Sequence, residues 1–353
     1  MMGKLESQGA PDVIDLDVPS WRTKSLGKGS TTIEEPSTAV IPVAGQSLRE
    51  ELFAWPTLKV RELRNVDVDV DSSLVFVEDR VAGQSGNAIR WARDAALITG
   101  GYVRARTVQP KAVVGNVAVL GDTHHHYHFM METLPSAIHI KQASPETRFV
   151  TSQDVGSFAR GVLEIAGIHV EKLDTGVVIR PERTVLCDAP VRFWPRRADL
   201  RVVRETLLGG SAAQVVESSE VVYVSRSRSS RSLRNEHLLE NAVANAGVRV
   251  VFLEEMSLQE QVQVFATARL VIGPHGAGLS NIVFMQPGSR LVEISSGDGW
   301  EPCYRRIAGV MGLEYVFLPA PGDAESPYGN ATRAFIDSVL SIVKSDSGGA
   351  HSR

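Results

Sequence analysis

One stretch, residues 270–281, constrains the fold of this chain more than any other; it reads Leu-Val-Ile-Gly-Pro-His-Gly-Ala-Gly-Leu-Ser-Asn. It opens with an apolar run, and that run ends in a turn that contains three glycines. A pattern typical of an amphipathic helix precedes it at 258–265, and a second apolar run follows it at 291–294. The succession of helix, buried strand, turn, helix and strand predicts one unit of a parallel sheet in an α/β fold.

The glycines of this turn, Gly273, Gly276 and Gly278, indicate that something comes close to the backbone. Without a Cβ atom the chain can turn tightly and leave room for a ligand. The predicted helix after the turn would point N–H groups and the positive end of its dipole at that ligand, which is the general form of a phosphate site. The spacing G-x-x-G-x-G differs from the dinucleotide-binding and P-loop patterns. A tight turn that binds nothing is therefore the alternative.

Another apolar run lies earlier in the chain, at 221–225. It is followed by serines interleaved with arginines at 226, 228, 231 and 234. If this strand lies near the strand of the glycine turn, an arginine at its end could bind phosphate oxygens in a bidentate way. A solvated basic loop is the alternative. Nucleic-acid binding is not expected, because the net charge is −4 and no aromatic residues are interleaved. Asn235 is expected to cap a helix over 236–246.

The third feature is a histidine cluster that consists of His124, His125, His126 and His128. Paired histidines can bind zinc, and Asp122 could add a carboxylate. However, no second group of metal ligands follows at a useful spacing. A metal-dependent hydrolase built on residues 124–128 stays an alternative. For most of the cluster, the simpler interpretation is a loop of histidines that bind no metal.

His128 and Glu132 stand four positions apart, which places them on one face of the helix that we expect to start at 123–125. Pro135 should end or kink that helix. The strand at 112–120 would place the start of the helix at the carboxyl edge of a sheet, where ligands bind in open α/β folds. There a carboxylate beside an imidazole can accept a proton from a hydroxyl group. An ordinary ion pair on the protein surface is the alternative.

Three segments, in this order along the chain, resemble those of glycosyltransferase family 61. The first is Tyr127 to Glu132 with Leu134-Pro135, and the second is Tyr223 to Arg226 with Arg231 and Asn235-Glu236. The third contains Gln261, residues 273–281, Phe284, Pro287-Gly288 and Val292-Glu293. The resemblance implies a GT-B-like α/β fold of two facing Rossmann-like domains, and sugar transfer from a nucleotide-sugar donor.

The resemblance also assigns roles to residues. It makes Glu132 the base that takes the acceptor proton, with His128 orienting Glu132 or touching the donor. It selects Arg226 and Arg231, rather than Arg228 and Arg234, for the diphosphate. The other expected donor-binding residues are His275, Gly276, Ala277, Gly278, Asn281 and Glu293, the last of these as a ligand of the ribose hydroxyls.

The expected reaction is an inverting hexosyl or pentosyl transfer. The partners would be a nucleotide sugar, with UDP as the expected nucleotide, and a glycan acceptor. Because arginines and a helix end could neutralise the diphosphate, no metal and no other cofactor is expected. In bacteria the resemblance suggests capsular or other surface polysaccharide as the product. Besides the hydrolase, a non-catalytic protein that binds nucleotide sugars or glycans is the other alternative.

With 353 residues the chain can form two domains, each with its own core. The expected division is a loosely ordered arm over 1–50, an acceptor-side domain over 51–206, a linker over 207–219, a nucleotide-sugar domain over 220–345, and a tail over 346–353. Two isolated cysteines, and the lack of both a signal peptide and a run of ~18 apolar residues, favour the cytoplasm. Peripheral association with the inner face of the membrane stays open.

Overall fold

The computed structural model describes residues 31–34, 37–43, 49–55, 58–77, 80–84, 91–188, 193–209, 219–296, 302–323 and 325–349. Most of the predicted arm and linker, and the end of the predicted tail, lie outside these ranges. The chain divides into two compact units. Unit 1 comprises Met1–Pro36 and Pro56–Arg192, and unit 2 comprises Ser37–Trp55 and Phe193–Arg353. The domain limits given above, and a facing arrangement of two domains, stay predictions.

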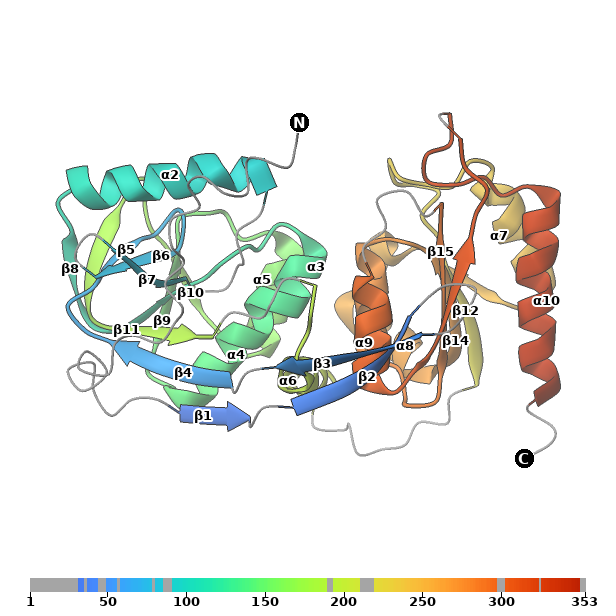
Figure 1. Ribbon diagram of the computed structural model, residues 1–353, viewed down its shortest axis with the longest axis horizontal. Helices are drawn as coiled ribbons and strands as arrows, with labels where there is room; N and C mark the ends of the chain where they lie inside the picture. Colours follow the sequence, from blue (N-terminus) through green and yellow to red (C-terminus); the bar gives the residue numbers. More distant parts are fainter. Residues whose placement is uncertain are drawn as a thin grey trace. The chain divides into compact units, whose positions relative to one another are not determined.

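Unit 2 contains a parallel sheet of five strands in the order β13-β12-β14-β15-β16. The strands are β12 (Glu220–Val224), β13 (Arg249–Val251), β14 (Ala268–Pro274), β15 (Arg290–Ser295) and β16 (Glu314–Pro319). Figure 1 shows α7 (Glu236–Asn245) and α10 (Arg333–Gly349) on one side of the sheet, with α8 (Leu258–Thr267) and α9 (Cys303–Met311) on the other. The predicted parallel α/β unit is confirmed.

The strand order of this sheet fixes where a ligand would bind. The first strand along the chain, β12, lies in the sheet between β13 on one side and β14 on the other. At such a switch point the connections leave in opposite directions and open a crevice beyond the carboxyl ends of the two strands. Arg226 follows β12, and the glycine turn follows β14. The sheet therefore brings Arg226 and the glycine turn together, which the sequence predicted only on the condition that their two strands are neighbours.

Apolar side chains cover this sheet on the side of α7 and α10. Leu270 and Ile272 of β14 pack in one cluster with Tyr223, Leu239 and Val339, all of which are buried. On the other side, α8 begins with a capping box, in which Ser257 and Glu260 bond each other's backbone N–H groups. The core thus holds the carboxyl ends of β12 and β14 in a fixed register.

Unit 1 has a mixed sheet. Its parallel part has the order β10-β9-β8-β11, formed by β8 (Lys111–Val119), β9 (Arg148–Thr151), β10 (Val170–Lys172) and β11 (Val178–Cys187). Antiparallel strands extend it beyond β11, namely β1 (Thr31–Glu34), β4 (Leu58–Leu63), β5 (Asp67–Asp69), β6 (Leu74–Val77) and β7 (Arg80–Gln84). Unit 1 therefore carries antiparallel strands in addition to the parallel, Rossmann-like part that the resemblance implies. Its parallel part nevertheless has its own switch point, between β8 and β11.

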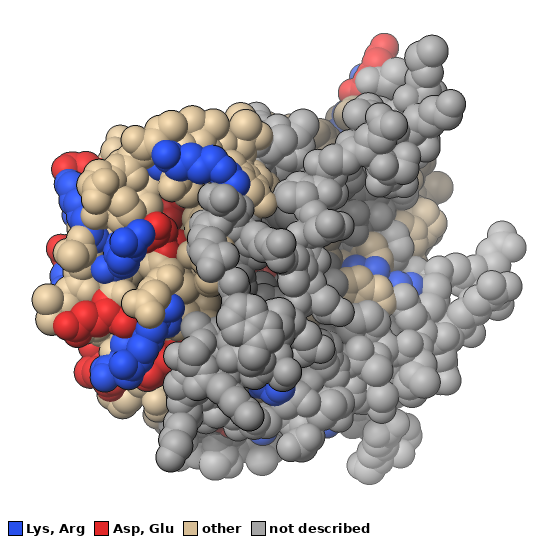
Figure 2. Space-filling model, turned by 60° about the vertical axis from the view of Figure 1, so that its left-hand side comes forward, with Lys and Arg blue, Asp and Glu red and all other residues tan. Residues whose placement is uncertain are grey.

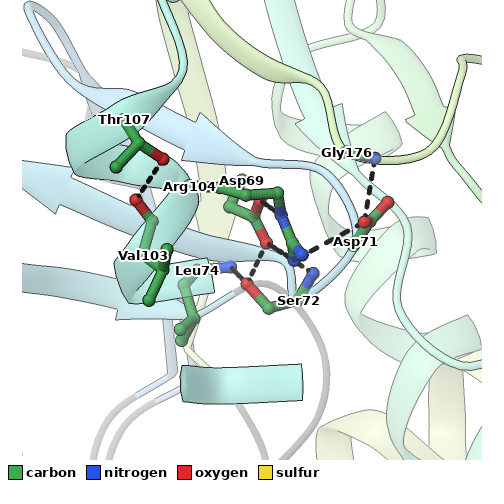
Figure 3. Close-up of polar contacts among 8 residues, drawn as sticks. All are labelled: Asp69, Asp71, Ser72, Leu74, Val103, Arg104, Thr107 and Gly176. Carbon is green, nitrogen blue, oxygen red and sulfur yellow. Dashed lines mark hydrogen bonds and ion pairs between the residues drawn. The ribbon is translucent and has the colours of Figure 1, made fainter. Parts of the chain in front are cut away.

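A partly buried ion pair connects α2 (Trp91–Thr107) to the antiparallel strands, as Figure 3 shows. Arg104 donates from Nε and Nη2 to the two carboxylate oxygens of Asp69, at 2.6 and 2.9 Å. The hydrogen bond to Asp69 raises the pKa of Arg104. Ser72 donates to the same carboxylate, and a Cβ at position 101 would collide with the Ser72 hydroxyl, so a glycine is needed there.

The described surface carries charges of both signs. On the face of the molecule in Figure 2, basic and acidic side chains lie intermixed where residues are described. Unit 1 contains exposed ion pairs such as Arg180–Asp67 and Arg148–Glu171. Within the described ranges, no helix combines the length and the apolar character needed to cross a lipid bilayer.

Candidate functional site

The candidate residues of unit 1 follow directly after β8. A short helix, α3 (His126–His128), continues into a π turn, η1 (Phe129–Thr133), and then into α4 (Leu134–Ala143). Pro135 was predicted to end or kink the helix, but it does not end it, because α4 continues through this residue. It lies in the first turn of α4, where a residue without an N–H group is tolerated. The helix begins later than expected, because Asp122 accepts bonds from the N–H groups of His124 and His125 and forms a turn there.

The π turn carries a histidine–carboxylate pair. Nδ1 of His128 lies 2.8 Å from Oε2 of Glu132. Glu132 is only 2% exposed, and its Oε1 is buried without a hydrogen-bond partner among the described residues. His128 is the more accessible of the two, with 12% of its side chain exposed. The pair is therefore not an ordinary surface ion pair, since the carboxylate lies beneath the imidazole, and π turns occur often at functional sites.

The other histidines of the cluster point to different partners. His125 contacts Asp122 at 2.8 Å, and the ring of His126 packs on Phe158 with the centroids 4.5 Å apart. Among the described residues, no group of three or more His, Cys, Asp or Glu side chains is arranged to hold a metal ion. The geometry thus gives the hydrolase alternative no support, because His126 is part of the packing under the helix.

The burial of His126 leads to a prediction about the stability of the fold at acidic pH. Burial lowers the pKa of His126 to about 4, so between pH 6.5 and 4 the unfolded chain binds a proton that the folded chain does not. Above pH 6.5 His126 does not lower the free energy of unfolding. Between pH 6.5 and pH 5 the free energy of unfolding should fall by about 2 kcal/mol because of His126 alone. His126→Phe should remove that part of the loss, whereas His124→Gln, at an exposed position, should not. Urea unfolding at pH 7.5 and pH 5 measures it; equal losses in both variants would contradict the assignment.

In unit 2, Arg226 and the glycine turn are in direct contact. Nη1 of Arg226 donates to the carbonyl of His275, and a Cβ at Gly276 would overlap the guanidinium. The glycine is therefore required by the arginine that packs on it. Burial lowers the pKa of Arg226, and the neighbouring charge of Arg231 lowers it further. A partly desolvated cation beside a second cation, at the switch point, is an arrangement that suits a polyanion.

The helix after the turn differs from the prediction. Residues 277–284 form a 3-10 helix, η4 (Ala277–Phe284), with Gly276 at its N-cap. The N–H of Leu279 donates to the carbonyl of Gly276 at 2.9 Å, so the tighter helix begins at once. A Cβ at Gly278 would lie 2.6 Å from Cδ1 of Leu253, so the Leu253 side chain would have to shift to admit one.

Two predicted donor ligands lie inside the protein. Asn281 is buried and donates to Oε1 of Gln261 at 2.9 Å, which joins η4 to α8. Glu293 is 0% exposed, and its two oxygens contact Nδ1 of His275 at 2.5 Å and the hydroxyl of Tyr315 at 2.7 Å. Neither carboxylate oxygen is thus directed to a ribose, and the geometry gives Glu293 the task of holding His275. Tyr315 was missed because nothing in its local sequence points to this partner.

The arginine loop is held by Glu236, which the sequence analysis named in the second family-like segment without giving it a role. This buried carboxylate accepts from the N–H of Arg226 at 2.7 Å, the N–H of Leu233 at 3.1 Å and the hydroxyl of Tyr223 at 3.0 Å. Burial raises the pKa of Glu236. Asn235 occupies the N-cap of α7, but its side chain makes no capping bond, because its backbone is left-handed. The sequence signal that could have identified Glu236 is an acidic residue in the first turn of a helix.

The remaining arginines differ in their surroundings. Arg228 pairs with Glu255 and lies over the ring of Phe252, and Arg234 pairs with Glu325; both arginines are exposed, as expected. Arg231 is also exposed, yet its charge acts on Arg226 and on the buried Tyr304. Tyr304 lies at the start of α9, with its ring 5.2 Å from that of His275.

Comparison with known proteins covers the same part of the chain. Residues 126–292 match the model of the family described as glycosyltransferase 61. Over 105 residues the chain is 32% identical to a beta-1,2-xylosyltransferase of Arabidopsis thaliana. The aligned residues make up 29% of this chain and 19% of that protein. Over 117 residues it is 31% identical to protein O-linked-mannose beta-1,4-N-acetylglucosaminyltransferase 2 of Takifugu rubripes, which is 31% of this chain and 20% of that protein.

These matches span about one fifth of the length of the two curated relatives. Among solved structures, that of E. coli heptosyltransferase WaaC with ADP aligns with 66% of this chain and 98% of that chain. The sequence identity is 13% and the TM-score is 0.38. The matched range 126–292 includes His128, Glu132, Arg226 and the glycine turn, and it stops one residue before Glu293.

Proposed function

The chain belongs to the glycosyltransferase 61 family, and from that premise we propose that it transfers a sugar from a nucleoside-diphosphate donor to a carbohydrate hydroxyl. The observation that carries the proposal is the Arg226 guanidinium, packed on the glycine turn at the switch point of the unit 2 sheet. A diphosphate leaving group gathers negative charge as the sugar departs. Fixed cations that lose no energy to reorganisation stabilise that charge.

The donor side of the reaction falls to unit 2. Arg226 would bind the diphosphate, and the exposed Arg231 would close on it from the loop. The backbone at Gly276, Ala277 and Gly278 would supply N–H groups at the start of η4. His275 would lie against the diphosphate, while Glu293 and Asn281 support the site from inside the protein in place of touching the donor.

The acceptor side falls to the pair on the π turn of unit 1. An inverting transfer needs one group that takes the proton of the attacking hydroxyl. Burial of Glu132 beneath His128 supports a division of roles in which His128 accepts the proton and Glu132 orients the ring, as a buried carboxylate does for the base of a catalytic triad.

The donor sugar would be a hexose or pentose carried by UDP. The names of the two relatives, a xylosyltransferase and an N-acetylglucosaminyltransferase, support that range. The acceptor would be a glycan, with capsular or other surface polysaccharide as its product. A transferase of that kind would work in the cytoplasm, or peripherally at the inner face of the membrane, where nucleotide sugars are available.

Transfer should be independent of divalent metal, because arginines and backbone N–H groups take the place of a metal on the diphosphate. A thermal-shift panel of nucleotide sugars identifies the donor, since a ligand at about 100 times its Kd adds about 2.7 kcal/mol of stability. Release of nucleoside diphosphate is then measured with a mixture of glycan acceptors, with and without excess chelator. Rates should agree within about twofold. Loss of the rate, restored by zinc, would favour the hydrolase instead.

A further inference from the structure

The loop that follows β16 carries a tyrosine, Tyr328, and is held in place by hydrogen bonds. Asp323 accepts from the N–H and from the hydroxyl of Ser326, at 2.8 and 2.7 Å, and Ser326 is buried. Gly329 has a φ of +107°, and a Cβ there would lie 2.6 Å from the Cβ of Ala320, so the position suits only glycine. The backbone on either side of the tyrosine is therefore fixed by the fold of unit 2.

Two further hydrogen bonds connect the neighbours of Tyr328 to the carboxyl edge of the sheet. The carbonyl of Pro327 accepts at 2.6 Å from the hydroxyl of Ser296, which directly follows β15. The carbonyl of Gly329 accepts at 2.9 Å from the N–H of Arg234, at the end of the arginine loop. In the sheet, β14 with its glycine turn lies between β15 and β12, the strand that leads into the arginine loop. The loop of Tyr328 is thus attached on both sides of the glycine turn.

The phenol of Tyr328 lies near the arginines of the site. Burial and the charge of Arg231 lower the pKa of Arg226, and the charge of Tyr328 acts on the same guanidinium in the opposite direction. Solvent screens such effects over short distances, so the two side chains are close together. Tyr328 is nevertheless 44% exposed, whereas Tyr304 and Tyr315 are buried. A ligand bound at Arg226 can therefore reach this aromatic ring.

We propose that Tyr328 is a platform for the sugar of the donor, with its ring against the apolar C–H face of that sugar. The inference rests on the proposed function, because it names the residue that contacts the sugar of that donor. A sugar ring has apolar C–H groups surrounded by hydroxyls, so it suits an aromatic ring that has polar side chains beside it. Asn330 and Asn235, whose amides bond each other at 3.2 Å, supply such side chains next to the tyrosine.

The chemistry of the donor favours this division of roles. Arg226 and Arg231 are suited to the charged diphosphate, which every nucleoside-diphosphate sugar contains. A neutral ring beside them adds nothing to the neutralisation of that charge, but it can cover a neutral group attached to it. Position 328 lies outside the range that the family model matches, so the resemblance assigns this tyrosine no role. Tyr328 is therefore a residue through which this chain distinguishes one donor sugar from another.

The test compares three ligands that share the diphosphate. They are inorganic pyrophosphate, the nucleoside diphosphate and the nucleotide sugar, the last two as selected by the thermal-shift panel. Calorimetry with the full chain measures the affinity of wild type and of Tyr328→Ala for each ligand. Tyr328→Ala should bind the nucleotide sugar about three- to tenfold more weakly, because the exposed part of the ring is no longer there to be covered. Its affinity for the other two ligands should stay within about twofold of wild type.

Two further variants serve as controls. Tyr328→Phe keeps the ring and should bind the nucleotide sugar within about twofold of wild type. Leu238→Ala removes a side chain of α7 that is 47% exposed, and it should match wild type with all three ligands. Because both positions are exposed, the thermal midpoints of all three variants should equal that of wild type.

The remaining outcomes would each overturn the role of Tyr328. An equal loss of affinity for the nucleoside diphosphate and the nucleotide sugar would place the ring against the base. A loss that includes pyrophosphate would mean that the substitution disturbs Arg226. Unchanged affinity for all three, with Arg226→Ala still weakening their binding, would remove Tyr328 from the site and leave the proposed function standing. If wild type binds none of the nucleotide sugars, the proposed function fails together with the inference.

Discussion

Replacing Glu132 with glutamine is expected to lower turnover by about 10²–10⁴-fold and to leave donor affinity unchanged. Glutamine keeps the shape of the side chain but offers an amide where His128 needs a carboxylate, so the ring loses its orientation and the stabilisation of its charge. Donor binding should persist, because Arg226 and the glycine turn belong to the other unit. Calorimetry with the donor, paired with turnover on a polysaccharide acceptor, separates the two effects.

His128→Gln should be about as damaging as Glu132→Gln, and the double variant no worse than either. Groups that act as one unit show such non-additive losses. Glu164→Gln, an exposed glutamate of α5 (Ser157–Ile165), serves as the control and should behave as wild type. Unchanged turnover in both variants would favour a protein that only binds its ligands. Full loss in Glu132→Gln with normal turnover in His128→Gln would return the base to Glu132 alone.

Arg226→Ala is expected to weaken binding of a nucleoside diphosphate by about 1.5–3 kcal/mol, which is the usual contribution of a hydrogen bond to a charged group. The guanidinium is partly buried on the glycine turn, so solvent screens it little. Arg228→Ala should change affinity by less than a factor of about two, because Arg228 is exposed and engaged with Glu255 and Phe252. Calorimetry at constant ionic strength measures both variants.

Gly276→Ala provides a second route to the same site. Its methyl group would displace the guanidinium of Arg226, a flexible end that can move without unfolding the chain. Affinity should fall as in Arg226→Ala, with the thermal midpoint almost unchanged. If Arg226→Ala and Arg228→Ala weaken binding equally, the arginines form a diffuse basic loop and the specific assignment is wrong.

The architecture of unit 2 could be predicted because its signals are local. The apolar runs at 221–225 and 270–272 end in polar or glycine-rich turns, and β12 and β14 do lie side by side. The pair of His128 and Glu132 followed from helical spacing, which a π turn preserves well enough to bring the two side chains together.

The rest depends on partners far away in the sequence. Glu293 looks like the exposed end of a strand until Tyr315, a residue of the next strand, covers it. Asn281 is in a motif that suggests ligand binding, yet Gln261 of α8 takes its amide. In unit 1 no local pattern could show that β4 and β5 pair antiparallel with β11.

Glu236 has a consequence for how this site can change over evolution. One carboxylate fixes the backbone at both ends of the arginine loop, at Arg226 and at Leu233, and anchors them to Tyr223 in the core. Of the six residues between the two fixed points, 227–232, Arg231 has a proposed role at the diphosphate, and the other five are thereby released from the task of shaping the site. Their length and sequence can diversify, as loops on rigid scaffolds do, while Arg226 keeps its place on the glycine turn.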